Sequence, residues 1–328
     1  MRKLLVKALD CFFLLRIPLL APVWTVLILG WISGNGNARL GGVLRAEYGG
    51  EGEQILWLSL LGFSLIVAAI YVTNQIADID SDRINHKLFL LPRGILSIAT
   101  AWVCALLCAC AGLLVAFFLL DAYMGVLFVL SLLLGMLYNF PPARLKDRAW
   151  GGTIANFVGH GVLTYLVGWY AAHFGESLTC ASMLKALTAS CAAGFANAAV
   201  YITTTIPDAE GDRITGKHTF CVTYGERFTA VAAAIACASA LAFSFVFEHN
   251  AWVMAVPAAV SLVIFIMLVV QPRRENAFKA FKWPVFILTA SVAVFVPVYA
   301  LLILVTFAGS RIYYKFRFHF DYPTFKAQ

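Results

Sequence analysis

The sequence predicts an all-α, polytopic membrane protein with about nine transmembrane helices. Of its 328 residues, 62% are hydrophobic and only 12% are charged, well below the roughly 25% of charged residues in soluble domains. Apolar segments of about 20 residues, the length that crosses the hydrocarbon core, recur from end to end without a Ser/Gly-rich linker. The mean hydropathy is +0.84. We therefore expect one integral membrane domain over residues 1–328.

Nine segments have the length and apolar character of a membrane span. They are expected at 17–35, 55–76, 95–119, 122–140, 152–173, 181–206, 225–247, 251–270 and 282–308. The even spacing of the spans favours a turn at Leu120–Tyr123 over one long helix. The first 16 residues carry four basic side chains and lack the long apolar core of a signal peptide, so an interfacial helix is expected there.

The basic residues predict the orientation of the spans. Seventeen of the 24 Lys and Arg residues lie in segments on the N-terminal side of the membrane, which by the positive-inside rule is cytoplasmic. A basic tail with Arg311 and Arg317 does not fit, because an odd number of spans puts it on the opposite side. Either the ninth span is misplaced or the tail is an exception. The net charge of +7 mostly reflects this asymmetry, so no nucleic-acid partner is expected.

An acidic cluster follows the second span. Asn74, Asp78 and Asp82 are spaced by four residues, which places them on one face of a helix. Hard cations such as Mg²⁺ prefer oxygen ligands, and Mg²⁺ usually bridges one or two carboxylates to substrate phosphates. Taken alone, the cluster is better explained by acids that solvate a helix end at the membrane surface.

The second half of the chain repeats this cluster 130 positions later. Residues 201–217 match residues 71–87 at eight of 17 positions, and Asp208 and Asp212 fall on Asp78 and Asp82. Arg83 and Lys87 likewise recur as Arg213 and Lys217. Such an echo indicates two pseudo-repeated halves. Two facing carboxylate pairs are the arrangement expected of two metal clusters that clamp a diphosphate, whereas simple surface solvation predicts no echo.

A basic element lies between the two acidic clusters. Pro141 and Pro142 end the fourth span, and Arg144, Lys146 and Arg148 follow on the membrane face that carries both clusters. A leaving diphosphate needs cations and metals to stabilise the charge that develops on its oxygens, so these side chains are candidate phosphate ligands. The competing explanation is that they only anchor the loop at the cytoplasmic surface.

Together these motifs resemble the UbiA-type family of intramembrane aromatic prenyltransferases. The similarity covers essentially the whole chain and rests on N-x-x-x-D-x-x-x-D at 74–82, Y-x-x-P-P-x-R-L-K at 138–146 and D-x-E-G-D at 208–212. The resemblance implies a helical bundle around a central cavity, capped on its cytoplasmic side by both acidic motifs and opened laterally for a prenyl tail.

The resemblance also implies a reaction, in which a prenyl group passes from a polyprenyl diphosphate to an acceptor and diphosphate is released. Mg²⁺ would be bound by Asn74, Asp78, Asp82, Asp208 and Asp212, the four aspartates being the catalytic set. The diphosphate would be bound by Arg144, Lys146, Arg83 and Lys217. An aromatic, quinone-type acceptor is expected. A non-aromatic lipid or a chlorin is the alternative acceptor, and a transporter or lipid-binding protein is the alternative class.

Two departures from the family pattern concern substrate choice. Thr204 and Thr205 stand where many members have Lys-Asp, and the first cytoplasmic loop keeps only Pro-Arg-Gly of a longer motif. Within the fifth span, His160 is an ionisable residue and thus a functional candidate, although an imidazole that bridges two helices is the simpler expectation. Arg16 is expected to reach the lipid headgroups rather than the diphosphate.

Overall fold

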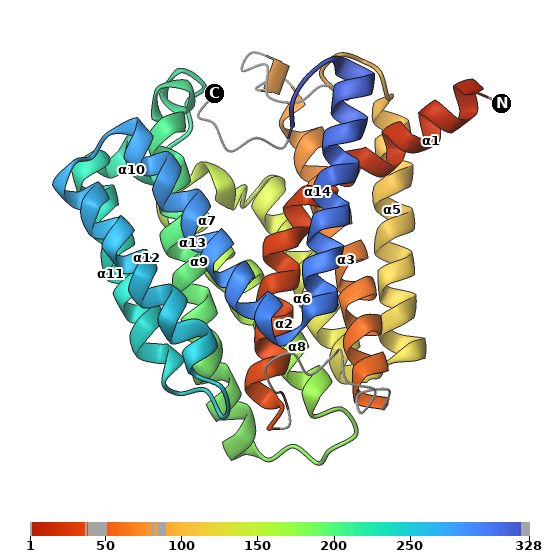
Figure 1. The fold of residues 1–328 in the computed structure, drawn as a ribbon. Helices are drawn as coiled ribbons and strands as arrows, with labels where there is room; N and C mark the ends of the chain where they lie inside the picture. Colours follow the sequence, from red (N-terminus) through yellow and green to blue (C-terminus); the bar gives the residue numbers. More distant parts are fainter. Residues whose placement is uncertain (1, 37, 39–50, 80–81, 84–89, 323–328) are drawn as a thin grey trace.

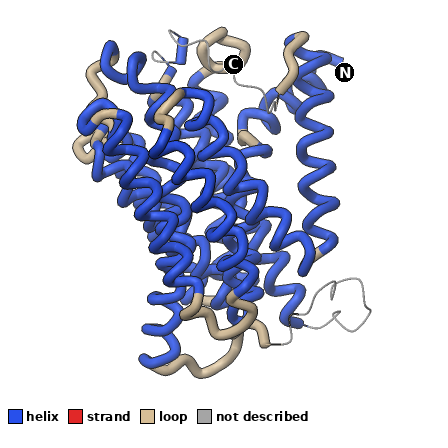
Figure 2. The backbone as a smooth tube through the Cα atoms, turned by 60° about the vertical axis from the view of Figure 1, so that its left-hand side comes forward, coloured by secondary structure: helices blue, strands red, loops and turns tan. Residues whose placement is uncertain are grey.

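The structure is a computed structural model that describes residues 2–36, 38, 51–79, 82–83 and 90–322. Within these ranges the regular elements are all helices (Figures 1 and 2). The β-type pairing found there is one isolated bridge between Arg148 and His218. Nine helical stretches in the same ranges are long and apolar enough to cross a membrane, a count that leaves out residues 149–172, which are divided among three shorter helices. The predicted all-α, polytopic membrane fold is confirmed.

The first half of the chain forms the right-hand side of the bundle in Figure 1. Its helices are α1 (Arg2–Leu14), η1 (Ile17–Leu19), α2 (Leu20–Gly34), α3 (Glu51–Ala77), α5 (Ile98–Leu114), the π-helical η4 (Val115–Leu119) and α6 (Ala122–Asn139). The predicted turn between the third and fourth spans is present. Asp121 caps α6 by accepting a hydrogen bond of 3.0 Å from the Met124 amide. As expected, α6 ends before the Pro141-Pro142 pair.

The second half begins with a helix that changes its winding in mid-membrane. It comprises α7 (Ala149–Asn156), the π-helical η6 (Phe157–Leu163) and α8 (Thr164–Ala172). The remaining helices are α9 (Cys180–Ile214), α10 (Phe220–Tyr224), α11 (Glu226–Ser244), α12 (Trp252–Val270), α13 (Arg274–Phe295) and α14 (Pro297–Phe318), with a short η5 (Leu145–Asp147) before α7. The helix α9 extends eight residues beyond its predicted end at 206 and includes the whole second acidic motif.

The predicted ninth span, 282–308, has the wrong bounds. The chain breaks at Val296, whose backbone leaves the helical region, and Pro297 starts a new helix because proline is well suited to the first turn. As a result α13 descends and α14 returns to the upper face (Figure 1). There Arg317 binds Asp10 of α1 at 3.1 Å. Of the two alternatives that the sequence left open, the misplaced ninth span is therefore the correct one.

Small residues let the inner helices pack closely. A methyl group at Gly30 or Gly168 would lie 2.1 Å or 1.7 Å from a backbone oxygen of the facing helix, which joins α2 to α8. Gly161 of η6 similarly meets Gly194 of α9, where an added methyl would lie 2.3 Å from its Cα. Such contacts are typical of membrane bundles, in which van der Waals packing holds helices together. They place η6 firmly between α9 and the interior of the bundle.

Candidate active site

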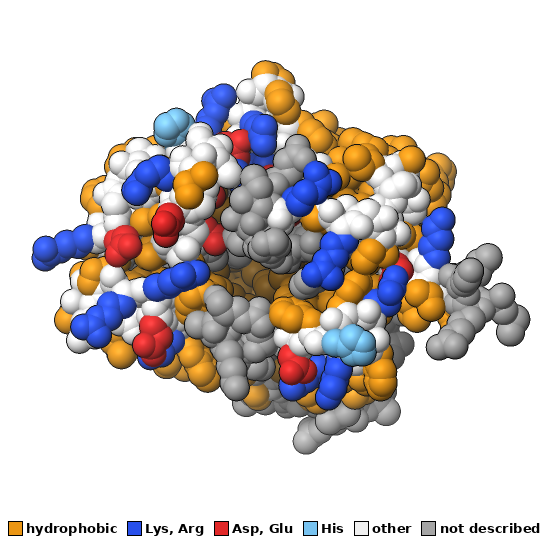
Figure 3. Space-filling model, turned by 90° about the horizontal axis from the view of Figure 1, so that it is seen from above, with side chains coloured by type: hydrophobic (Ala, Val, Ile, Leu, Met, Phe, Trp, Pro, Cys, Tyr) orange, Lys and Arg blue, Asp and Glu red, His pale blue; other side chains and the backbone are white. Residues whose placement is uncertain are grey.

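A cavity of about 250 Å³ lies between α3, α6 and the α7–η6–α8 segment. Its upper part is polar and includes Asn74, Tyr138 and Asn139, whereas Phe63 and Val67 form an apolar lower part. Figure 3 views the upper face, where charged side chains surround a central hollow with an apolar floor. Such a cavity can hold a molecule with a polar head and a hydrocarbon body.

The amide of Asn74 is held in place by a second asparagine. Its Nδ2 donates a hydrogen bond of 2.8 Å to Asn139 Oδ1. Asn139 is buried and its own Nδ2 donates to the Ile70 carbonyl and the Thr73 hydroxyl. These bonds fix the orientation of the Asn139 amide, so that its Oδ1 is the atom that accepts from Asn74 Nδ2. The Oδ1 of Asn74 then remains as the accepting atom of the Asn74 amide. This is the atom through which asparagine binds a hard cation.

Asp78 lies where three segments meet. Lys146 Nζ, from η5, is 2.8 Å from Asp78 Oδ2, and the two side chains are only 7% and 14% exposed. Lys217 Nζ, from the loop after α9, is 4.0 Å from Asp78 Oδ1. Burial lowers the pKa of Lys146 below its ordinary value, and the Asp78 carboxylate partly offsets that effect. The first acidic motif, the central basic motif and the second repeat are thus in direct contact.

The second acidic motif lies on the last turns of α9. Asp208 and Asp212 are half-buried, and Asp212 Oδ2 accepts a hydrogen bond of 2.9 Å from the Thr219 hydroxyl. The backbone amide of His218 donates to the Asp147 carbonyl at 2.9 Å. This bond ties the loop that follows the second motif to the loop that carries Lys146.

The two predicted arginine ligands lie farther out. Arg144 is 44% exposed and forms an ion pair of 2.6 Å with Asp147, and Arg83 is exposed, with its Nε 3.4 Å from the Pro92 carbonyl. Neither contact involves Asp78. Their role as diphosphate ligands stays a prediction. Asp80 and Lys87, which belong to the first repeat, lie outside the described residues.

The donor atoms suit magnesium, although the carboxylates are not gathered into one group. No three His, Cys, Asp or Glu side chains of the described residues come close enough together to hold a metal ion by themselves. The candidate donors are carboxylate and amide oxygens, and Mg²⁺ commonly takes only one or two carboxylates and completes its shell with water and phosphate oxygens. The residues therefore fit a metal that shares its ligands with a diphosphate.

Sequence reasoning missed Asn139 and an aromatic group above the cavity. Tyr138, in the last turn of α6, lines the cavity beside Asn74 and opposite Asn156 of α7. Asn139 sits within the quoted basic motif, and a polar residue in the last turn of an apolar span was the available signal. Its pairing with a residue 65 positions away has no signature in a single sequence.

Comparison with known families gives a direct result. The model of the UbiA prenyltransferase family matches residues 23–290, most of the chain. The chain belongs to the UbiA prenyltransferase family. The resemblance inferred from the motifs is confirmed.

Two named relatives of this UbiA-family chain act on aromatic acceptors. It is 30% identical over 171 residues to a probable homogentisate phytyltransferase 2 of Oryza sativa subsp. japonica, covering 50% of this chain and 45% of that protein. It is 28% identical over 179 residues to a 2-acylphloroglucinol 4-prenyltransferase of Humulus lupulus, covering 53% and 43%. The matched region spans less than half the length of these relatives.

Solved structures share the fold over nearly the whole chain. A UbiA homologue from Archaeoglobus fulgidus bound to GPP and Mg²⁺ superposes with a TM-score of 0.65 at 21% identity, over 91% of this chain and 98% of that one. The apo structure of a homologue from Aeropyrum pernix K1 gives a TM-score of 0.66 at 17% identity, over 85% and 96%. At these identities the likeness establishes the fold.

Proposed function

We propose that this chain transfers a prenyl group from a polyprenyl diphosphate to an aromatic, quinone-type acceptor in a Mg²⁺-dependent reaction that releases diphosphate. The observation that carries the proposal is the contact of Lys146 and Lys217 with Asp78. An acid and two cations from three separate motifs converge beside Asn74, which lines the cavity between its polar upper part and the rest of the bundle. This is the chemistry needed to hold a diphosphate head above a hydrocarbon tail.

In the proposed complex the acidic side chains and Asn74 bind the metal, and the basic side chains bind the diphosphate. Mg²⁺ is bound by Asn74, Asp78, Asp82, Asp208 and Asp212, and the diphosphate by Lys146, Lys217, Arg144 and Arg83. Mg²⁺, when bound, offsets charge on the departing diphosphate oxygens. Lys146 releases Asp78 and takes a phosphate oxygen instead. Because this exchange keeps both ions paired, the buried lysine is never left without a counter-ion.

The choice of an aromatic acceptor is supported by the relatives, which are named for transfer to homogentisate and to acylphloroglucinols. The cavity offers matching polar groups for a phenolic ring, among them Ser131, Asn156 and Thr164. The prenyl tail would occupy the apolar lower part near Phe63 and Val67. We further propose that the site faces the cytoplasm, and that the chain is one domain of two pseudo-repeated halves.

The test uses the full chain in lipid nanodiscs. Protein would be incubated with Mg²⁺, with dimethylallyl, geranyl or phytyl diphosphate, and with homogentisate or a 2-acylphloroglucinol, while diphosphate release and prenylated product are measured. We expect Mg²⁺-dependent product that is lost in Asp78→Ala and in Asp208→Ala and retained in the control Glu275→Gln, an exposed acid of α13.

Three outcomes would contradict the proposal. Full activity in both aspartate variants would show that Asp78 and Asp208 do not bind a metal that the reaction needs. In parallel reactions with a chlorin or a glycerol phosphate lipid as the acceptor, product formed only with one of these would replace the aromatic acceptor. Movement of a solute across the membrane without any covalent product would identify a transporter instead.

A further inference from the structure

His160 occupies the junction of two cavities. Its side chain lines the 250 Å³ cavity and also a smaller one of about 100 Å³, which is bounded by Pro22, Val23, Tyr71 and Asn197. The imidazole faces the Tyr71 ring at a centroid distance of 6.0 Å. No hydrogen bond joins its ring nitrogens to the described part of the chain, so the expected bridge between two helices is not what holds this residue there.

The local winding of the chain directs His160 to this position. It lies in η6, the π-helical stretch between α7 and α8, and π-helical turns within α-helices are frequent at functional sites. Its neighbour Gly161 is pressed against Gly194 of α9. Adjacent residues of a helix point in different directions, and the His160 side chain lines both cavities. The contact between the two glycines holds this turn of η6 against α9.

His160 also lies at a useful depth. Its partner Tyr71 precedes Asp78 by seven residues on α3, which at 1.5 Å per residue is about 10 Å below the acid along the helix axis. With the diphosphate beside Asp78, the reacting carbon of the donor and the acceptor ring fall between these two levels. An imidazole at the depth of Tyr71 is then within reach of the acceptor rather than of the diphosphate.

The other described residues that line the two cavities are poor proton acceptors. Arg16 keeps its proton permanently, and the amides of Asn74, Asn139, Asn156 and Asn197 are not basic. Tyr71 and Tyr138 carry phenols that hold their protons at neutral pH. These tyrosines and Arg16 are also the titratable groups that face the cavities from α3, α6 and the α1–η1 junction. A neutral imidazole is the only ordinary base in this set.

We propose that His160 accepts the proton that the aromatic acceptor loses during prenylation, an inference that rests on the proposed function. The C1–O bond of the donor breaks and its electron pair leaves with the diphosphate. The new bond forms between C1 and a ring carbon, and the proton of that carbon passes to a ring nitrogen of His160, which restores the aromatic ring. The imidazolium then returns its proton to water through the cavity mouth.

The experiment compares His160→Gln with His173→Gln, a control at the lower end of the same spanning segment, where His173 stacks on Trp169. We expect His160→Gln to lower the rate of aromatic transfer about 10²-fold, as is typical for loss of a general base. Its KM for the prenyl diphosphate should be unchanged, and the acidic limb of the pH–rate profile should disappear. His173→Gln should behave as wild type. Added imidazole should partly restore transfer in His160→Ala.

Binding of geranyl S-thiolodiphosphate with Mg²⁺ separates the two proposals. If wild-type protein neither binds this analogue nor transfers a prenyl group, the proposed function fails. If wild-type protein does both and His160→Gln transfers at the wild-type rate with an unchanged pH profile, only the role of His160 is overturned. A variant that binds the analogue normally is folded, so slow transfer in such a variant supports the role. If His160→Gln and His160→Ala lose analogue binding and transfer to the same extent, and imidazole does not rescue transfer in His160→Ala, the role of His160 is also contradicted.

Discussion

Asn139 Oδ1 accepts a hydrogen bond from Asn74 Nδ2 at 2.8 Å, which joins the last turn of α6 to the first acidic motif. The bond orients the Asn74 amide before any metal arrives. Residues that orient a metal ligand typically change affinity by about 10- to 100-fold when replaced. The pair therefore links the stability of the α3–α6 contact to the strength of the proposed metal site.

Asn139→Ala should raise the Mg²⁺ concentration needed for half-maximal diphosphate release at least about tenfold, because Asn74 loses its orienting partner. Titration with MgCl₂ at saturating donor measures this. Asn276→Ala is a suitable control, since the Asn276 side chain donates to the nearby Gln271 carbonyl in an exposed hydrogen bond. An unchanged Mg²⁺ requirement in Asn139→Ala would show that Asn74 does not serve the metal.

Lys146→Met should raise the KM for the prenyl diphosphate about 10- to 100-fold, since a hydrogen bond to a charged group contributes about 1.5–3 kcal/mol. Steady-state kinetics with geranyl diphosphate measures the change. Lys279→Met provides the control, because Lys279 is 47% exposed and pairs with Glu275 on the same helix. Loss of kcat without any change in KM would assign Lys146 to another step.

Thr205 and Thr204 should differ sharply in their effect on stability. The Thr205 hydroxyl accepts a hydrogen bond of 3.1 Å from the buried amide of Cys221 on α10, whereas the Thr204 hydroxyl donates to the Tyr201 carbonyl of its own helix. Thr205→Val leaves that amide without an acceptor and should cost about 1–3 kcal/mol. Thr204→Val should cost much less. Thermal unfolding in detergent compares the two, and equal midpoints would contradict the assignment.

Both chain ends should lie on one side of the membrane. Reporter proteins fused to the N-terminus and after residue 328 should give the same orientation, because α14 returns to the face of α1. A reporter inserted at the exposed Gly175 should give the opposite one, because the loop between α8 and α9 lies at the end of the bundle away from both termini (Figure 1). Opposite results for the two termini would restore the original nine-span topology.

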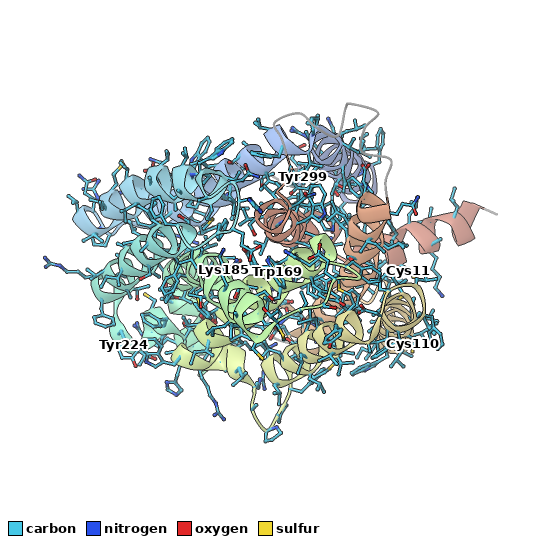
Figure 4. The ribbon with its side chains drawn as sticks, turned by 90° about the horizontal axis from the view of Figure 1, so that it is seen from below. Cys11, Cys110, Trp169, Lys185, Tyr224 and Tyr299 are labelled. Carbon is cyan, nitrogen blue, oxygen red and sulfur yellow. The ribbon has the colours of Figure 1, made fainter. Side chains whose placement is uncertain are left out.

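Apolar length and motif spacing predicted most of the helices and the two acidic motifs. They did not predict the break at Val296, because an apolar run hides a turn that tertiary contacts stabilise. Tyr299, just after the break, donates a hydrogen bond of 3.0 Å to the Ala21 carbonyl of α2, and Figure 4 shows it directed toward that helix. Contacts between residues 278 positions apart leave no trace in hydropathy.

The sequence identified the residues of the site but not how these residues pair with one another. The acids and lysines were identifiable because each motif repeats or follows a span end. The sequence did not indicate that Lys146 and Lys217 share Asp78, nor that Arg144 pairs with Asp147 instead. These choices depend on how the loops after α6 and α9 join through His218 and Asp147. Such pairing is set by backbone geometry rather than by residue type.

The junction of α1 with α14 has a consequence for how the chain can be built. The Asp10 carboxylate accepts hydrogen bonds from Tyr313 and Arg317, and Phe13 stacks on Tyr313 at 3.8 Å. The first and last helices are therefore neighbours. The contacts of α1 with α14 can form only after the final helix has been synthesised, so the bundle is completed last at this junction.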